Sequence, residues 1–341
     1  MRQTDAIILS CFGYELTSNE KKFFKNINPF GFILFKRNFK NKEQIKKLIQ
    51  NLKKATLNSD LLIFIDQEGG RVQRLDNHEF IKFPPQMTFG NIYKKDNKKA
   101  IELAYKSSFL MGEQLKEICI DVNFSPVCDL YFDNAHKVIG DRSFGSDPEM
   151  VLRLSSRFVM GLQDSGIIAV PKHFPGHGSI SEDSHIEKPI DQRTLNEIEN
   201  KDLIPFKELM NNLDGIMTAH ILFSEVDMRI ATFSKVWIKQ ILKEQMKFEG
   251  MIFSDDLSMK GTNEFVSFYD KTKNAIDSGC EMILICNNRE GVKDALKYFE
   301  NNNLEASEKI FSMLMANDVS WTDLEKNKIR MEISTQLEKL I

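Results

Sequence analysis

Eight short, continuous apolar runs are the feature of this sequence that most limits its fold. Uninterrupted hydrophobicity, as opposed to strict alternation, is typical of strands that are buried on both faces of a parallel sheet. The starts of the runs are separated by about 25 to 60 residues, which leaves room for a helix and its loops between neighbours. The pattern therefore predicts an α/β protein. The eight runs are residues 6–11, 31–36, 61–66, 122–127, 167–170, 215–220, 251–255 and 281–286.

The stretches between the runs carry signals for helices. Asn41 can cap a helix whose apolar residues recur at helical spacing between positions 45 and 52. Asp147 followed by Pro148 predicts the start of a helix that stops near residue 166. Thr194 and Glu197 have the spacing of a capping box and predict a helix over 198–209. We expect the last stretch, residues 304–341, to form closing helices.

Eight strands alternating with helices predict a single (β/α)₈ TIM barrel. A doubly wound parallel sheet is the competing fold. The 341 residues contain no Pro/Ser-rich linker, composition break or low-complexity tract. We therefore expect one catalytic domain over residues 1–341.

Composition and charge narrow the class of protein. Hydrophobic residues make up 42% and charged residues 28%, as in a soluble globular protein with a large core. A net charge of -3 argues against a nucleic-acid partner, because such proteins usually carry a basic excess. The five scattered cysteines predict buried thiols in a reducing compartment. No apolar run suits a signal peptide or a membrane helix, so we expect a cytoplasmic protein with no membrane partner. We also expect a monomer.

Polar side chains gather where four of the predicted strands end, and barrel active sites lie at those ends. The third run ends in Asp66, with Arg74 in the loop that follows, and His220 ends the sixth. The fifth run is followed by Lys172, His173 and His177, with Asp183 and His185 in the same loop, and the seventh run ends in Asp255 and Asp256. Four of the six histidines thus lie at the ends of two strands.

Glycoside hydrolysis is the first chemical interpretation. A retaining mechanism needs a carboxylate that attacks the anomeric carbon and a second group that protonates the departing oxygen. Asp255, at a strand tip, is suited to the attack, and the adjacent Asp256 could cap the following turn. The pair Asp183 and His185 predicts an imidazole that a carboxylate orients and stabilises as the acid/base.

Two alternatives from other classes remain. His173, His177, Asp183 and His185 are potential ligands of a metal-dependent hydrolase, and barrels do host zinc sites. Against this, Pro175 and Gly176 break the helix that an i, i+4 histidine pair needs, and the first run ends in Ser10 and Cys11 without a His-x-His pattern. We therefore expect no metal and no cofactor. A non-catalytic sugar-binding barrel is the other alternative.

Four long motifs closely resemble glycoside hydrolase family 3. They are residues 65–74, residues 139–144, residues 172–178 with 183–185, and residues 253–259. The similarity is to the single-domain bacterial branch of the family, the NagZ-type β-N-acetylhexosaminidases, and it runs over nearly the whole chain. Relatives usually carry prolines where this chain has Met228 and Ile230, which puts the shape of that loop in question.

The resemblance implies a role for each matching residue. Asp255 would be the nucleophile that forms a covalent glycosyl-enzyme, and His185, paired with Asp183, would be the general acid/base. Hydroxyls and the N-acetyl group of the sugar in the −1 subsite would be bound by Asp66, Arg74, Arg142, Lys172 and His173. The implied substrate is a small carbohydrate, GlcNAc β-1,4-linked to 1,6-anhydro-N-acetylmuramic acid with or without a peptide, released in cell-wall recycling. We expect the loop at 131–138 to contact the aglycone.

Overall fold

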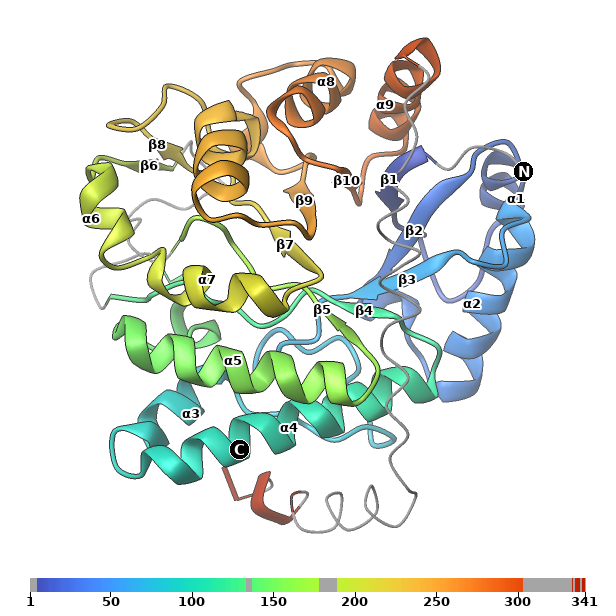
Figure 1. The fold of residues 1–341 in the computed structure, drawn as a ribbon. Coiled ribbons are helices and arrows are strands. Elements are labelled where there is room, and N and C mark those ends of the chain that lie inside the picture. Colours follow the sequence, from blue (N-terminus) through green and yellow to red (C-terminus); the bar gives the residue numbers. More distant parts are fainter. Residues whose placement is uncertain are drawn as a thin grey trace.

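The computed structural model describes residues 5–132, 137–177 and 189–302, with residues 333, 335–337, 339 and 340 near the end of the chain. At its centre lie eight parallel strands in the order β5-β4-β3-β2-β1-β10-β9-β7 (Figure 1). Each of the eight apolar runs overlaps one of them. Their bounds are β1 (Asp5–Leu9), β2 (Pro29–Leu34), β3 (Leu62–Ile65), β4 (Val122–Asn123), β5 (Ile168–Ala169), β7 (Gly215–Met217), β9 (Met251–Asp256) and β10 (Met282–Ile285).

The two edges of this sheet meet just beyond β5 and β7. The backbone N–H of Phe174 donates to the carbonyl of Met217 at 2.8 Å, and the N–H of Ala219 donates to the carbonyl of Phe174 at 2.7 Å. The residue after β7, Thr218, is the parallel bridge partner of Phe174. This closure confirms the (β/α)₈ barrel, since a doubly wound sheet would leave both edge strands open.

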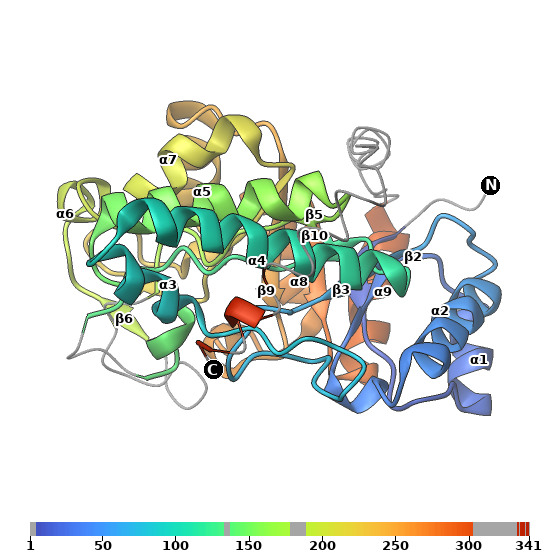
Figure 2. The ribbon, with the colours of Figure 1, turned by 90° about the horizontal axis from the view of Figure 1, so that it is seen from below.

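Helices surround the barrel, and Figure 2 shows α4 and α5 running side by side along it. A separate pair of short parallel strands, β6 (Ile190–Asp191) and β8 (Leu222–Phe223), lies outside the barrel sheet. The helices are α1 (Ser18–Phe24), α2 (Lys42–Thr56), α3 (Gln86–Tyr93), α4 (Asn97–Glu117), α5 (Pro148–Asp164), α6 (Leu195–Glu199), α7 (Ile204–Leu209), α8 (Phe268–Ser278) and α9 (Arg289–Asn302), with the π-helix η5 (Val236–Gln245) and the 3₁₀ turns η1 (Lys36–Asn38), η2 (Gly140–Arg142), η3 (Met210–Asn212), η4 (Ala231–Phe233) and η6 (Lys260–Thr262).

The helix starts are confirmed, and one helix extent is wrong. Asn41 and Asp147 cap α2 and α5 through their side chains, and Thr194 forms a capping box with Glu197. The single helix predicted over 198–209 is instead two short helices, α6 and α7. Pro205 explains the break, because a proline lacks the N–H and clashes with the preceding turn inside a helix but is tolerated in the first turn of a new one. The closing helices predicted over 304–341 fall almost entirely outside the described residues.

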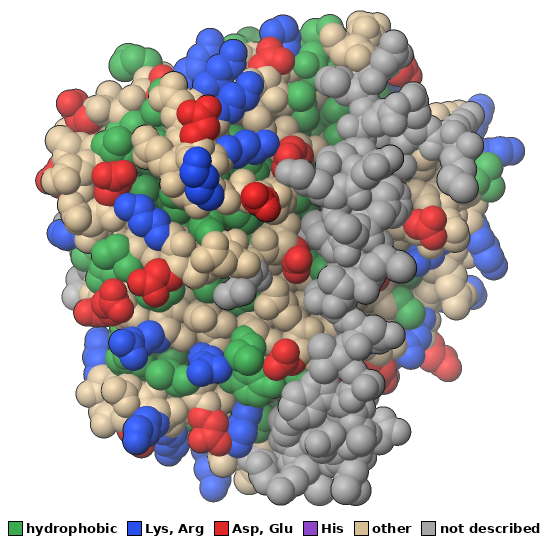
Figure 3. Space-filling model, in the orientation of Figure 1, with side chains coloured by type: hydrophobic (Ala, Val, Ile, Leu, Met, Phe, Trp, Pro, Cys, Tyr) green, Lys and Arg blue, Asp and Glu red, His purple; other side chains and the backbone are tan. Residues whose placement is uncertain are grey.

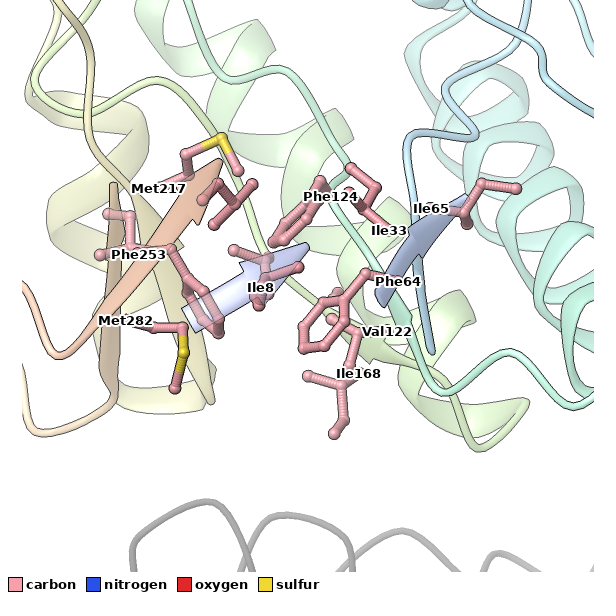
Figure 4. Packing of buried hydrophobic residues seen from close by; sticks show 14 of the residues in the cluster. Ile8, Ile33, Phe64, Ile65, Val122, Phe124, Ile168, Met217, Phe253 and Met282 are labelled. Atoms are coloured by element: carbon pink, nitrogen blue, oxygen red, sulfur yellow. The ribbon is translucent and has the colours of Figure 1, made fainter. Parts of the chain in front are cut away.

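Three phenylalanine rings fill the middle of the barrel. The rings of Phe64 and Phe124 are 5.4 Å apart, and Phe253 lies 6.1 Å and 5.6 Å from them, with Ile8 nearby (Figure 4). Glycines on neighbouring strands make room, because a Cβ at Gly31 would lie 2.4 Å from the Phe64 ring and one at Gly215 2.7 Å from the Phe253 ring. The interior is therefore packed core and not a pore, as in other barrels of this kind.

The surface charges and the burial of the cysteines can be compared with the expectations drawn from composition. On the face seen in Figure 3, acidic and basic side chains are interspersed. Within the described ranges no helix is long and apolar enough to span a membrane. Four cysteines are buried free thiols, as expected, but Cys119 is exposed because it lies in the turn that follows α4, contrary to the expectation that all five are buried.

Candidate active site

A cavity of about 560 Å³ opens at the carboxyl ends of the barrel strands. Side chains at or beyond the ends of β2, β3, β4, β5, β7, β9 and β10 line it. The structure brings together in this one cavity all of the described residues that the sequence predicted for the site: Asp66, Arg74, Arg142, Lys172, His173 and Asp255.

The loop after β3 contributes several side chains because it turns sharply at Gly69 and Gly70. Both glycines have positive φ angles, 97° and 55°, which side chains with a Cβ rarely adopt. The N–H of Glu68 donates to the carbonyl of Val72 at 2.9 Å and closes the turn. As a result Glu68 and Arg71 reach the same cavity as Asp66.

A buried network of charges forms one wall of the cavity. The Nζ of Lys172 donates to Asp66 Oδ1 and lies within ion-pair distance of Glu68 Oε1, at 2.7 Å in each case. Arg142 forms a two-pronged pair with Glu68, both contacts being 2.8 Å. The side chains of Glu68 and Lys172 are only 1% and 3% exposed. The second Asp66 oxygen accepts a longer hydrogen bond of 3.3 Å from Arg74.

This network keeps its acids ionised. Burial alone would raise the pKa of Glu68, but the adjacent Arg142 and Lys172 hold that pKa well below its usual range. The pKa of Asp66 is lowered in the same way, by Lys172 and Arg74 against the effect of burial. Burial opposes the charge of Lys172, yet Asp66 and Glu68 raise its pKa. The wall therefore presents fixed charges to a ligand.

A second pair orients His173. Its Nδ1 lies 2.6 Å from Asp129 Oδ2, and its backbone N–H donates to Asp129 Oδ1 at 3.1 Å. Burial would raise the pKa of Asp129, but His173 lowers it. A carboxylate accepts, so Nδ1 carries the proton and Nε2 is the nitrogen left for a ligand. Burial lowers the pKa of the neighbouring His177 to about 4, so that imidazole is neutral at pH 7.

The two adjacent aspartates at the tip of β9 have different roles. Asp255 lines the cavity, and its Oδ1 accepts the backbone N–H of Asp256 at 2.7 Å. The carboxylate of Asp256 instead accepts from Ser258 N, Ser258 Oγ and Cys286 N, at 2.7–3.2 Å. Asp256 also borders the cavity, but its carboxylate is engaged in building the turn, as predicted.

Sequence reasoning missed two charged residues of this site. Glu68 lies inside the motif at 65–74, and Asp129 lies just beyond the fourth apolar run, but nothing local reveals their partners. His220, in contrast, is a supporting residue: it is buried, and its Nε2 lies 3.1 Å from the carbonyl of Asp256.

Several predictions concern residues outside or at the edge of the described ranges. Asp183 and His185 lie outside the described residues, in the stretch that follows His177. In the 131–138 loop, Val138 lines the cavity.

In the loop after β8, where the missing prolines put the shape in question, Ile230 is buried and forms a β-bridge with Leu222, whereas Met228 is 76% exposed. Among the residues that the structure describes, no three His, Cys, Asp or Glu side chains are grouped to hold a metal ion.

Comparison with known proteins assigns the family. The profile of the glycosyl hydrolase family 3 N-terminal domain matches residues 6–312. The chain belongs to this family. A β-hexosaminidase from Tolumonas auensis is 40% identical to this family 3 protein over 320 residues, which is 93% of this chain and 92% of the relative.

Solved structures of family members share the whole fold. NagZ from Neisseria gonorrhoeae in complex with N-trifluoroacetyl-D-glucosamine is 31% identical, with a TM-score of 0.86 over 99% of this chain and 98% of that one. The same protein in complex with a zinc ion is 30% identical, with a TM-score of 0.84 over 99% and 97% of the two chains. This family 3 protein is thus a glycoside hydrolase on a single barrel fold.

Proposed function

We propose that this family 3 enzyme is a retaining β-N-acetylglucosaminidase that removes GlcNAc from the non-reducing end of cell-wall fragments. One observation carries the proposal: the Asp255 carboxylate opens onto the same cavity as the charged side chains of Asp66, Lys172 and Arg142. A nucleophile and a hydroxyl-binding wall that face one space are what a glycosidase −1 subsite requires.

The hydrogen-bonding capacity of the wall suits a pyranose. Lys172 has three donors, and contacts to Asp66 and Glu68 use two of them. Each Asp66 oxygen accepts one protein donor and keeps a lone pair for a sugar hydroxyl. Acceptors on Asp66 beside donors on Lys172 and Arg142 can bind vicinal hydroxyls in a fixed orientation, and such contacts tighten as the ring flattens toward the transition state.

The proposed reaction has two steps. An oxygen of Asp255 attacks the anomeric carbon while His185, as imidazolium, gives its proton to the departing glycosidic oxygen. In the second step neutral His185 takes a proton from water, the water oxygen bonds to the anomeric carbon, and Asp255 leaves as a carboxylate. Asp183 would orient and stabilise the imidazolium. His177 lines the cavity and the chain then runs on to these two residues, which supports an acid/base from this loop.

The names of the relatives support GlcNAc as the sugar. The curated relatives are β-hexosaminidases, and one solved NagZ holds N-trifluoroacetyl-D-glucosamine. We extend this to GlcNAc linked to 1,6-anhydro-N-acetylmuramic acid, with or without its peptide, as the substrate in peptidoglycan recycling. A single catalytic domain over 1–341, a monomeric state and a cytoplasmic location stay predictions from the sequence.

A substrate panel tests the proposal. The panel contains 4-nitrophenyl β-GlcNAc, β-GalNAc and β-glucoside, together with the GlcNAc–anhydromuramyl disaccharide. We expect kcat/KM to be highest for the two GlcNAc substrates and to be lost in Asp255→Asn. A preference for the glucoside would contradict the substrate assignment but not the fold. Activity that is lost on chelation and restored by zinc would favour a metal-dependent hydrolase, which a relative solved with zinc makes worth testing.

A further inference from the structure

The cavity has a buried floor and an exposed rim. Glu68, Lys172, His173 and Cys286 on the floor are buried, whereas Arg71, Lys260 and Asn287 on the rim are exposed. An exo-acting glycosidase holds the terminal sugar at the floor, next to the nucleophile, so the glycosidic bond points outward and the aglycone lies at the rim. The rim residues therefore meet the aglycone.

Lys260 is the rim cation whose charge is left for a ligand. The other four cations of the cavity are paired: Arg71 with Asp141 at 2.7 Å, Arg74 with Asp66, Arg142 with Glu68, and Lys172 with both acids. Arg71 also donates to the carbonyls of residues 137–139, at 2.8–2.9 Å. Among the described residues, the Lys260 ammonium has no hydrogen-bond or ion-pair partner.

The backbone that carries Lys260 is fixed relative to Asp255. The N–H of Met259 donates to the carbonyl of Asp256 at 3.0 Å, and Thr262 Oγ1 donates to the carbonyls of Leu257 and Met259 at 2.9 Å and 2.7 Å. The turn built by Asp256 and Ser258 connects Asp255 to the segment that carries Lys260. The backbone of Lys260 is therefore held at the rim of the cavity, and the flexible side chain lets the ammonium adjust to a ligand.

We propose that Lys260 is a specificity-determining residue that binds a carboxylate on the aglycone. The inference rests on the proposed function, because it takes the floor as the −1 subsite. An ammonium beside a carboxylate forms a charge-assisted hydrogen bond. The favoured substrates are then GlcNAc glycosides whose aglycone is anionic, such as one that carries a lactyl carboxylate.

The test uses two disaccharides that differ only in charge: GlcNAc–anhydromuramic acid with its lactyl carboxylate free, and the same compound as the methylamide. We expect the wild type to favour the carboxylate by about tenfold in kcat/KM, which corresponds to about 1.4 kcal/mol. Lys260→Met should bring this ratio close to one, and Lys260→Arg should keep most of it. Because Lys260 is exposed, the wild-type ratio should also fall when the ionic strength is raised from 0.05 to 0.5 M.

The matched control is Lys239→Met, which removes an exposed lysine of η5 that is not among the residues lining the cavity and should keep the wild-type ratio. A wild-type ratio near one would overturn the inference and leave the proposed function intact, since both compounds are still cleaved. A tenfold ratio that survives in Lys260→Met would overturn it as well. If the wild type cleaves neither disaccharide nor an aryl β-GlcNAc, the proposed function fails and the inference fails with it.

Discussion

Replacing Glu68 by glutamine should destabilise the protein strongly, although the side chain keeps its shape. Glu68 accepts both prongs of Arg142 and contacts Lys172, and it is 1% exposed. In Glu68→Gln an amide N–H₂ faces cationic donors, and the buried Lys172 and the half-buried Arg142 each lose a counter-charge. Breaking a buried ion pair from one side costs about 3–5 kcal/mol. At roughly 1.4 °C per kcal/mol for a chain of 341 residues, the melting temperature should fall by about 4–7 °C.

Urea unfolding gives the free energy of unfolding, with the fluorescence of the fully buried Trp237 as one reporter. The matched control is Glu117→Gln, which breaks the Lys42–Glu117 pair. The distance from Lys42 Nζ to Glu117 Oε2 is 2.7 Å, the same as from Lys172 Nζ to Glu68 Oε1, but the Glu117 side chain is 41% exposed. An exposed pair is worth about 0–1 kcal/mol. Equal losses in the free energy of unfolding for the two variants would show that burial does not determine how much the Glu68 ion pairs stabilise the protein. That result would contradict the prediction.

The dependence on pH provides a second check on Glu68. Its pKa is lower in the folded protein than in the unfolded chain. The unfolded chain therefore binds more protons as the pH falls, and the stabilisation from this carboxylate is complete above its unfolded pKa of about 4.3. The stability gap between wild type and Glu68→Gln should be constant from pH 6 to pH 8 and should shrink below about pH 4. A gap that widens on acidification would contradict the assigned direction.

Three further predictions concern the chemistry. Asp255→Ala should lower kcat by several orders of magnitude with little loss of folding, and equal damage from Asp256→Ala alone, in a variant still folded by circular dichroism, would move the nucleophile by one residue. His185→Ala should slow the natural disaccharide by about 10² to 10⁴ but slow dinitrophenyl β-GlcNAc far less, since a good leaving group needs little protonation; parallel losses across an aryl series would reduce His185 to a structural role. Dialysis against a strong chelator should leave the rate unchanged within about twofold, because a carboxylate and an imidazole suffice for the reaction. A loss of activity that zinc restores would show that the reaction also needs a metal.

The sequence predicted the barrel well because the information for it is local. Each barrel strand is a continuous apolar run, and caps such as Asn41 mark helix starts through residues three positions away. Pro205 was also a local signal, because a long helix cannot continue through a proline. The apolar residues at helical spacing on both sides of it nevertheless favoured one continuous helix.

The charge network could not be predicted in the same way, because its partners are distant in the chain. Glu68 and Arg142 are 74 residues apart, Asp66 and Lys172 are 106 apart, and Asp129 and His173 are 44 apart. Only the assembly of the parallel sheet, in which β3, β4 and β5 are neighbours, brings the ends of these strands together. The family resemblance pointed to five sugar-binding residues in the cavity, yet Glu68 and Asp129, the acids that hold three of them in place, were visible only once the fold was known.

In the proposed mechanism Asp255 forms a covalent bond to GlcNAc, and labelling of the active site detects that bond. A 5-fluoro-β-GlcNAc fluoride has a good leaving group, while its ring fluorine destabilises the oxocarbenium-like transition states, so the glycosyl-enzyme should accumulate. Intact mass spectrometry should then show the addition of one 5-fluoro-GlcNAc unit, and peptide mapping should find it on Asp255, with no addition in Asp255→Ala. A label on any other residue would contradict the account. So would a wild-type enzyme that hydrolyses the fluoride with inversion and never carries the label.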